Sequence, residues 1–342
     1  MKAVFVTEHN TVSVKDFPKP KIGDGDVLVR MRACGLCGSD LEKVYGHYGM
    51  VSQRLGHEPS GEIVSLGSKV TDFKVGNRVF VHHHVPCYSC HYCQNEDYTI
   101  CPQYQKSNLE PCGLAEEFLV PEWNVSRGGM IKLPDSVSFE EAAMIEPLAC
   151  CIKAINKSGM KNGDDIAVVG VGPAGIMHLI LSKSFGAGKV FALDINDFRL
   201  DFAKNLGAYL TINIGEQDAS KMIKESTDDR GADIVIVATG STKALLQSLE
   251  LVRRGGRVIL FGVPPKPSNV RLDVNRLFSN EIRLIPSLAA SEKETNQALE
   301  LITTKRINIK PIITHRFTLE KAEVAIKCAY EAKDVMKVLV TS

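Results

Sequence analysis

The sequence lacks an excess of charge of either sign. Its 342 residues include 41 lysines and arginines against 40 aspartates and glutamates, which gives a formal net charge of +1. Binding to nucleic acid depends on clustered basic residues that neutralise phosphates, and the sequence contains no such cluster. We therefore expect no nucleic-acid partner.

Long apolar runs are also missing. The longest stretches, such as residues 234–238, have the length of a strand, well short of the roughly 18 residues that span a bilayer. The first residues show neither the apolar stretch nor the small-residue cleavage site of a secretory signal. Internal repeats and low-complexity segments are absent too. These absences predict a cytoplasmic protein that has no membrane partner.

The length and the 44% of hydrophobic residues are enough to build two cores, so we predict two domains. Up to about residue 145, short strands alternate with glycine and proline turns, which is typical of an all-β lobe with polar groups on its loops. The clearest of these strands are 27–31, 60–64 and 78–81.

From Asp165 the pattern becomes strand, glycine turn, helix and strand, repeated. Its apolar runs are 166–169, 189–194, 234–238 and 258–261, with a helix expected at 176–185. Buried runs of this kind are typical of a parallel sheet, so this half is predicted to be a doubly wound α/β domain. The tail at 312–340 has strand-like ends around a helix-like stretch at 319–331, and we expect it to pack back on the first lobe.

Four thiols lie in one short stretch with the pattern Cys-x-x-Cys-x-x-Cys-x7-Cys. They are Cys87, Cys90, Cys93 and Cys101. Loops of this spacing can place four sulfurs around one tetrahedral Zn²⁺, so the pattern predicts a closed structural metal site within residues 86–102. Two disulfides are the alternative, but they require an oxidising compartment, whereas thiols of a cytosolic chain stay reduced.

A glycine-rich turn connects the strand at 166–169 to the helix that follows. It fits Gly-x-Gly-x-x-Gly with Gly170, Val171, Gly172, Pro173, Ala174 and Gly175. The first glycine permits the tight turn, the second lets a pyrophosphate approach the backbone, and the third lets helix and strand pack. The turn therefore predicts a dinucleotide cofactor. A glycine turn without a ligand is the alternative, which the complete strand–turn–helix context disfavours.

An acidic residue, Asp194, closes the next strand. A carboxylate at this place accepts hydrogen bonds from a ribose and repels the 2′-phosphate of NADP, so NAD is the expected cofactor. Arg199 leaves the choice open, because a nearby arginine can accommodate a 2′-phosphate. An ion pair between Arg199 and Asp194 is the simpler interpretation.

A second group of possible metal ligands is spread over the first half of the chain. Its members are Cys37, His57, Glu58 and Glu146. One thiolate, one imidazole and carboxylates can leave a coordination position open, which is typical of catalytic zinc. Each residue alone would be interpreted as structural. Cys34 and Cys37 could also form a redox pair, but no thioredoxin-like βαβ unit surrounds them, so we expect Cys34 to be structural.

Together these motifs resemble the zinc-dependent medium-chain alcohol dehydrogenases, closest to the branch of the polyol (sorbitol-type) and threonine dehydrogenases. The resemblance covers nearly the whole chain and rests on Cys-Gly-Ser-Asp at 37–40, Gly-His-Glu at 56–58, the four thiols, Glu-Pro-Leu-Ala at 146–149 and the glycine turn. It implies a GroES-like catalytic domain made of residues 1–146 and 286–342, and a Rossmann NAD-binding domain made of residues 147–285. It also implies a homo-oligomer, either a tetramer or a dimer.

The resemblance further implies two zinc ions per subunit, one structural and one catalytic. Cys37 and His57 would be firm ligands of the catalytic zinc, with Glu58 as a third ligand in some states. Glu146 would be either a ligand or the anchor of the zinc-bound water. The alcohol dehydrogenases proper place a second cysteine where this chain has Glu146. Cys150 and Cys151 follow closely, but we expect the carboxylate to take that role.

The implied reaction is the oxidation of an alcohol, with zinc as Lewis acid and the nicotinamide of NAD as hydride acceptor. Ser39 resembles the first proton acceptor of the family, and Asp40 resembles the carboxylate that orients the zinc-binding histidine. Glu42 stands where a relay histidine is common, so the later steps of proton transfer stay open. His47 is a possible substitute, and at most one or two of His82, His83 and His84 are expected to face the cleft.

The resemblance suggests a polyol, a sugar or a related hydroxylated metabolite as the substrate. Oxidation of an amino alcohol, as in L-threonine 3-dehydrogenase, is an alternative. Two other classes compete with this interpretation. A zinc-free reductase of quinone type would lack Cys37, His57 and Glu146, and a catalytically inactive NAD-binding structural protein would have no reason to keep Ser39 beside an open metal site.

Overall fold

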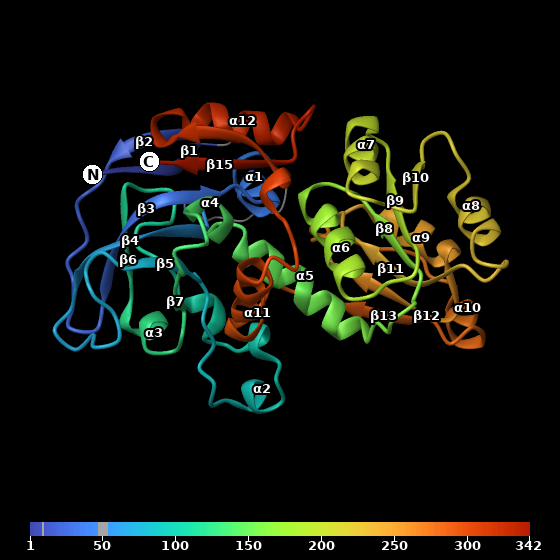
Figure 1. Cartoon of the computed structure of the whole chain (residues 1–342), viewed down its shortest axis with the longest axis horizontal. Helices are drawn as coiled ribbons and strands as arrows, with labels where there is room; N and C mark the ends of the chain where they lie inside the picture. Colours follow the sequence, from blue (N-terminus) through green and yellow to red (C-terminus); the bar gives the residue numbers. More distant parts are fainter. Residues whose placement is uncertain (9, 47–53) are drawn as a thin grey trace. The chain divides into compact units, whose positions relative to one another are not determined.

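The structure is a computed structural model, and it describes residues 1–8, 10–46 and 54–342 (Figure 1). His47, considered above as a proton relay, lies outside the described residues. The chain divides into two compact units, which we call the first unit (residues 1–149 and 289–342) and the second unit (residues 150–288). The boundaries expected from the sequence lie three residues earlier. The N-terminal segment of the first unit was expected to end at residue 146 and ends at 149, and its C-terminal segment was expected to begin at 286 and begins at 289.

In the described part of the first unit, seven strands form one sheet in the order β14-β15-β3-β4-β5-β7, with β6 paired to β3. Their bounds are β3 Val27–Gly35, β4 Glu58–Leu66, β5 Arg78–Val81, β6 Glu117–Val120, β7 Met130–Lys132, β14 Ile313–Thr318 and β15 Lys337–Thr341. The three strands predicted from the sequence are confirmed, and β3 and β4 are longer than predicted. A separate hairpin joins β1 (Lys2–Glu8) and β2 (Thr11–Asp16).

The C-terminal tail completes this sheet, which confirms that it packs on the first lobe. β15, drawn in red in Figure 1, runs antiparallel to the blue β3 and pairs Leu339 with Gly35. The expected helix at 319–331 is a 3-10 turn, Leu319–Lys321, followed by α12 (Ala322–Glu331). Among the described residues, the other α-helices that lie wholly in this unit are α1 Gly38–Tyr45, α2 His91–Gln94, α3 Glu122–Val125, α4 Phe139–Ala142 and α11 Glu292–Thr303. Further 3-10 turns are Tyr98–Ile100, Tyr104–Lys106 and Lys310–Ile312.

The pairing of β3 with β4 positions the residues that matter most for function. Gly35, the last residue of β3, pairs with Glu58, the first residue of β4. A Cβ on Gly35 would lie only 1.8 Å from Oε2 of Glu58, so this close approach requires glycine. Cys37 follows two residues later as the N-cap of α1, which brings its thiol to the same end of the sheet.

The second unit contains six parallel strands in the order β10-β9-β8-β11-β12-β13. Their bounds are β8 Ile166–Val169, β9 Val190–Asp194, β10 Leu210–Asn213, β11 Ala232–Val237, β12 Val252–Leu260 and β13 Arg283–Pro286. The strand order reverses between β8 and β11, which confirms the predicted doubly wound fold. Ligands of such sheets bind where the order reverses, and the glycine turn follows β8.

The helices of the second unit are α6 Pro173–Ser184, α7 Asp197–Asn205, α8 Ala219–Glu225, α9 Thr242–Leu251 and α10 Val274–Ser279, while α5 (Ile145–Ser158) contains residues of both units. α6 begins three residues before the predicted helix, because Gly172 is its N-cap and Pro173 is tolerated at the first helical position. β12 is also longer than predicted. Among the described residues, no helix has both the length and the apolar character needed to cross a membrane.

Candidate metal centres and dinucleotide turn

The four thiols predicted to bind zinc meet in one cluster of the first unit. Their Sγ atoms lie 3.9 Å apart for Cys87 and Cys93, 3.6 Å for Cys90 and Cys93, and 3.6 Å for Cys87 and Cys101. A tetrahedral zinc with Zn–S bonds of about 2.3 Å has sulfurs about 3.8 Å apart, so the cluster fits the ion. All ten cysteines of the chain are free, and none forms the alternative disulfides.

Backbone N–H groups around the cluster favour the thiolate form that a metal requires. Cys87 Sγ accepts hydrogen bonds from the N–H groups of Ser89 at 3.5 Å and Cys90 at 3.3 Å. Hydrogen bonds from Ser89 are the main reason that the pKa of Cys87 falls to about 5. Burial instead raises the pKa of Cys93 to about 12, so a bound cation is needed to deprotonate the whole set.

Three members of the second predicted set also converge. Cys37, His57 and Glu58 each place a ligand atom within 4.8 Å of the other two. Cys37 is partly exposed, whereas Glu58 is fully buried. One sulfur, one imidazole nitrogen and one carboxylate oxygen are suitable zinc ligands, and a set of three leaves the fourth tetrahedral position for water or substrate. The residues present therefore fit a catalytic zinc.

Asp40 orients the histidine of this set. Its Oδ1 lies 3.4 Å from His57 Nδ1, and its carboxylate accepts hydrogen bonds from the N–H groups of Gly56 and Cys37. Burial would raise the pKa of Asp40, but His57 and Lys43 hold it well below its usual value. An imidazole held through Nδ1 presents Nε2 to a metal, which is the role that the sequence suggested for Asp40.

Lys337 compensates the buried charge of Glu58, and our sequence analysis missed it. Its Nζ lies 2.5 Å from Glu58 Oε2, and both side chains are almost completely buried. Burial raises the pKa of Glu58, while Lys337 and His57 act in the opposite direction. For Lys337, burial would lower the pKa, but the carboxylate of Glu58 raises it. The only signal in the sequence is a lysine at the start of the apolar stretch at 337–340.

Glu146 lies in a different group. It is the second residue of α5 in a nearly buried position, and one of its carboxylate oxygens lies within 4.8 Å of ligand atoms of His82 and His83. Its charge also raises the pKa of Glu58, so the carboxylate lies near the set of Cys37, His57 and Glu58 as well. Cys150 and Cys151 belong to none of the three possible metal groups that the described residues form. In this arrangement Glu58 is therefore the carboxylate next to the thiol and imidazole ligands.

The remaining candidates of the proton path lie on α1. Ser39 is half-buried in the first turn of the helix and precedes Asp40. Glu42 lies one turn further along, and Cys34, on β3, is fully buried. Burial raises the pKa of the Cys34 thiol, which suits a structural residue better than a reactive one.

In the second unit, the glycine turn has the geometry of a nucleotide-binding loop. Gly170 has a φ of +87°, a left-handed conformation that favours glycine. A Cβ on Gly175 would lie 2.0 Å from the carbonyl oxygen of Gly170, whereas a Cβ on Gly172 would meet nothing closer than Arg199 at 3.6 Å. Pro173 and Ala174 open α6, whose first N–H groups have no side-chain cap from Gly172. The helix start is thus available to an anion.

Asp194 and Arg199 lie beside this turn. Asp194 accepts hydrogen bonds from the N–H groups of Val171 at 2.8 Å, Ile195 at 2.8 Å and Asn196 at 3.1 Å. Its Oδ2 is also 3.9 Å from Arg199 Nη1. The carboxylate therefore connects the glycine turn to the end of β9. Arg199, the possible partner of a 2′-phosphate, lies next to this carboxylate.

Two protein-family models match the chain. The model described as "Alcohol dehydrogenase GroES-like domain" matches residues 23–135, and the model described as "Zinc-binding dehydrogenase" matches residues 173–304. Together they cover more than half of the chain, with the first model in the first unit and most of the second model in the second unit.

Individual proteins match over nearly their whole length. Sorbitol dehydrogenase of Bacillus subtilis (strain 168) is 34% identical over 346 residues, which cover 99% of this chain and 97% of the relative. D-xylulose reductase A of Aspergillus niger is 31% identical and covers 94% of this chain and 92% of its own length. The solved structure of a zinc-binding dehydrogenase of Sinorhizobium meliloti 1021 bound to NADP has a TM-score of 0.90 and 29% identity, covering 100% and 99%.

Replacing one thiol of the four-cysteine cluster should remove the metal there. We expect Cys90→Ser to lower the zinc content by one ion per chain and to lower the melting temperature, because a structural zinc contributes folding free energy. Elemental analysis and thermal unfolding measure both effects. Cys328→Ser, at a half-buried cysteine outside the metal groups, is the matched control and should change neither. Unchanged zinc in Cys90→Ser would contradict the assignment.

Two alanine substitutions in the glycine turn should separate packing from binding. Gly175→Ala places a methyl group against the Gly170 carbonyl and should cost about 1–3 kcal/mol of stability. Gly172→Ala meets no such obstacle, so its stability should be unchanged while the dinucleotide binds at least about tenfold more weakly, roughly 1.4 kcal/mol. Thermal unfolding and nucleotide titration test this pair, and equal losses of stability in both variants would refute it.

Proposed function

Because the chain belongs to the zinc-dependent medium-chain alcohol dehydrogenases, in the branch that contains the sorbitol dehydrogenases, we propose that it oxidises a polyol or sugar alcohol with NAD. The observation that carries the proposal is the convergence of Cys37, His57 and Glu58 on one point of the GroES-like unit. The glycine turn of the second unit supports it, because it offers a helix N-terminus to the cofactor.

The side chains of the first unit have separate tasks in this reaction. When bound, zinc acts as a Lewis acid toward the alcohol and the nicotinamide accepts the hydride. Cys37, His57 and Glu58 hold the ion, and Asp40 holds the imidazole in the tautomer that leaves Nε2 available. Lys337 keeps the carboxylate of Glu58 ionised and in place.

Ser39 is assigned the first proton transfer. A hydroxyl can accept a proton from one group while donating to another, as a relay requires. Ser39 lies two residues after the ligand Cys37 and next to the orienting Asp40, at the half-buried start of α1. The later steps are left unassigned, because Glu42 replaces the histidine that is common in the family.

We propose NAD rather than NADP because of Asp194. Two like charges about 4 Å apart repel by about 1 kcal/mol in water and by about 4 kcal/mol at an effective dielectric constant of about 20. This corresponds to roughly one to three decades of discrimination against a 2′-phosphate. NADP is the second candidate, since Arg199 lies beside Asp194 and a structurally similar dehydrogenase was solved with NADP.

The assembly and location of the enzyme belong to the same proposal. We assign two zinc ions to each subunit, one in the four-thiol cluster and one on Cys37, His57 and Glu58. The resemblance to the family supports a tetramer or a dimer. The free state of all ten cysteines supports a reducing compartment, which for this enzyme we take to be the cytoplasm.

A cofactor-reduction screen tests the proposed function. Zinc-replete protein is incubated with NAD⁺ or NADP⁺ and a panel of polyols, aldoses, inositols, threonine and simple alcohols. We expect a polyol or sugar alcohol to give the fastest NADH formation, which a chelator abolishes and added zinc restores. Absence of cofactor reduction with every alcohol of the panel would refute the proposal, and faster reduction of NADP⁺ would favour the second cofactor candidate.

The proton-transfer role of Ser39 predicts a specific kinetic defect. Ser39→Ala should lower kcat by about 10²- to 10⁴-fold, the range for one positioned proton-transfer group, without loss of zinc. Steady-state kinetics and elemental analysis provide the measurement, and Ser126→Ala, on the surface of the same unit, is the control. Wild-type turnover in Ser39→Ala would show that another group takes the proton.

A further inference from the structure

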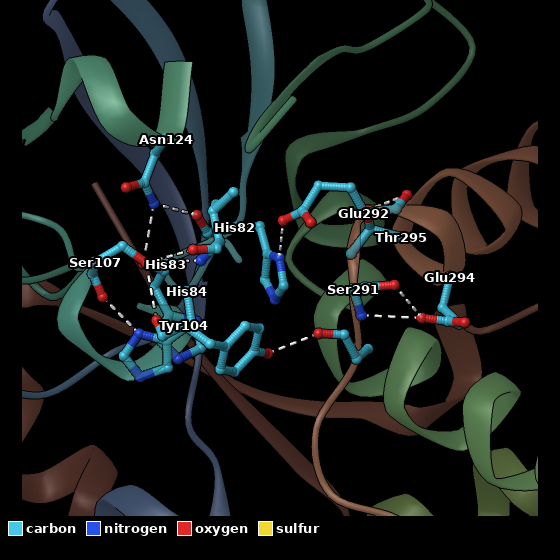
Figure 2. Close-up of polar contacts among 12 residues, drawn as sticks. His82, His83, His84, Tyr104, Ser107, Asn124, Ser291, Glu292, Glu294 and Thr295 are labelled. Atoms are coloured by element: carbon cyan, nitrogen blue, oxygen red, sulfur yellow. Dashed lines mark hydrogen bonds and ion pairs between the residues drawn. The ribbon is translucent and has the colours of Figure 1, made fainter. Parts of the chain in front are cut away.

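Three consecutive histidines, His82, His83 and His84, follow β5 directly in the first unit. The first and the last of them are each held by a partner. Nδ1 of His82 lies 2.7 Å from Glu292 Oε1, and Nδ1 of His84 lies 2.6 Å from the carbonyl oxygen of Ser107. Figure 2 shows both contacts as dashed lines. The chain thus fixes the outer two rings of this run through its own groups.

The middle histidine, His83, differs from its neighbours. Its side chain is partly exposed, while its Nδ1 is buried without a partner. Neither of its ring nitrogens forms a hydrogen bond within the part of the chain that the structure describes. A polar group in this state calls for a partner from outside the chain, either a water or a ligand.

His83 lies at the candidate catalytic centre. The centroid of its ring is 5.0 Å from that of His57. One of its ring nitrogens is within 4.8 Å of a carboxylate oxygen of Glu146, whose charge in turn acts on Glu58. His83 therefore belongs to the same centre as the set formed by Cys37, His57 and Glu58, without being a member of that set.

The surroundings of His83 hold its ring in place. The ring centroids of His83 and His84 are 4.0 Å apart, and His84 is itself fixed by the Ser107 carbonyl. The buried amide of Asn124 donates hydrogen bonds of 3.0 Å to the carbonyl oxygens of His82 and His83, which Figure 2 also shows. A side chain held by its neighbours in this way can recognise a ligand without being reordered.

The chemistry of an imidazole suits a hydroxyl group. Each ring nitrogen can donate or accept a hydrogen bond, and a hydroxyl can do both. The proposed function places the reacting hydroxyl of the substrate at the set formed by Cys37, His57 and Glu58. Hydroxyls on adjacent carbons are separated by only three bonds, so the group that binds the second hydroxyl must adjoin the group that binds the first. His83 adjoins His57 and meets this requirement.

We propose that His83 is a specificity-determining residue that hydrogen-bonds the hydroxyl next to the one that is oxidised. The enzyme then selects vicinal diols over alcohols with a single hydroxyl. This inference rests on the proposed function and deepens it, because it names the part of the substrate that is recognised and the side chain that recognises it. It requires no metal beyond the two zinc ions already assigned to the subunit.

The first experiment compares two alcohols that differ by one hydroxyl, butane-2,3-diol and butan-2-ol. His83→Phe keeps a planar ring beside His84 but has no nitrogen. We expect the ratio of kcat/KM for the diol to kcat/KM for the mono-alcohol to fall by about 5- to 100-fold, the effect of losing one hydrogen bond at a partly buried site. The value for butan-2-ol and the zinc content should stay unchanged.

His315→Phe is the matched control. His315 is a partly exposed histidine of β14 in the same unit and belongs to none of the possible metal groups of the described residues. It should leave the ratio as in the wild type. An unchanged ratio in His83→Phe would overturn the proposal. Loss of zinc from that variant would overturn it as well, because His83 would then hold the metal and not the substrate.

A binding measurement separates this proposal from the proposed function. Saturation-transfer NMR, with zinc-replete protein and no cofactor, gives the affinity for each alcohol independently of turnover. The wild type should bind butane-2,3-diol more tightly than butan-2-ol, and His83→Phe should lose that preference. Should the wild type reduce no cofactor, these affinities still decide on His83. Equal affinity of the wild type for both alcohols would refute the role of His83 even if the variant did not fold.

Discussion

The buried ion pair between Glu58 and Lys337 is the interaction on which the proposed metal chemistry depends. A carboxylate removed from water must be compensated, or it binds a proton and ceases to be a good metal ligand. Lys337 reaches Glu58 only because β15 pairs with β3, while β3 pairs with β4 on its other side. The C-terminal strand and two strands from the first part of the chain therefore meet in one sheet, where Lys337 compensates the charge of the carboxylate that we propose as a zinc ligand.

Other buried carboxylates of the first unit are also compensated by nearby hydrogen-bond donors and charged groups. Asp40 is compensated by His57 and Lys43, as well as by backbone N–H groups. Glu292 accepts hydrogen bonds from His82 and Tyr88, of which Tyr88 belongs to the loop of the four-thiol cluster. Each of these carboxylates fixes a side chain that holds or borders a proposed metal. The contacts that compensate the buried charge therefore also position the ligands.

Local patterns predicted a large part of this structure. The four thiols are close in sequence, so their spacing alone limits them to one cluster, and the glycine turn lies within a single strand–turn–helix unit. The apolar runs at 166–169 and 78–81 are strands with the predicted bounds. The start of α6 was misplaced by three residues, because Pro173 was counted as part of the turn although proline is tolerated at the first position of a helix.

Functional residues that lie near one another in the chain could thus be assigned from the sequence alone. They are the four thiols with their zinc-type spacing, the nucleotide turn with Asp194, and Cys37 with Ser39 and Asp40. The pairing of Glu58 with Lys337, the grouping of Glu146 with His82 and His83, and the contact between His82 and Glu292 required the folded chain. These partners are separated by long stretches of sequence. Strand register and helix packing bring them together. No local pattern of residues predicts which distant side chain will compensate a buried charge.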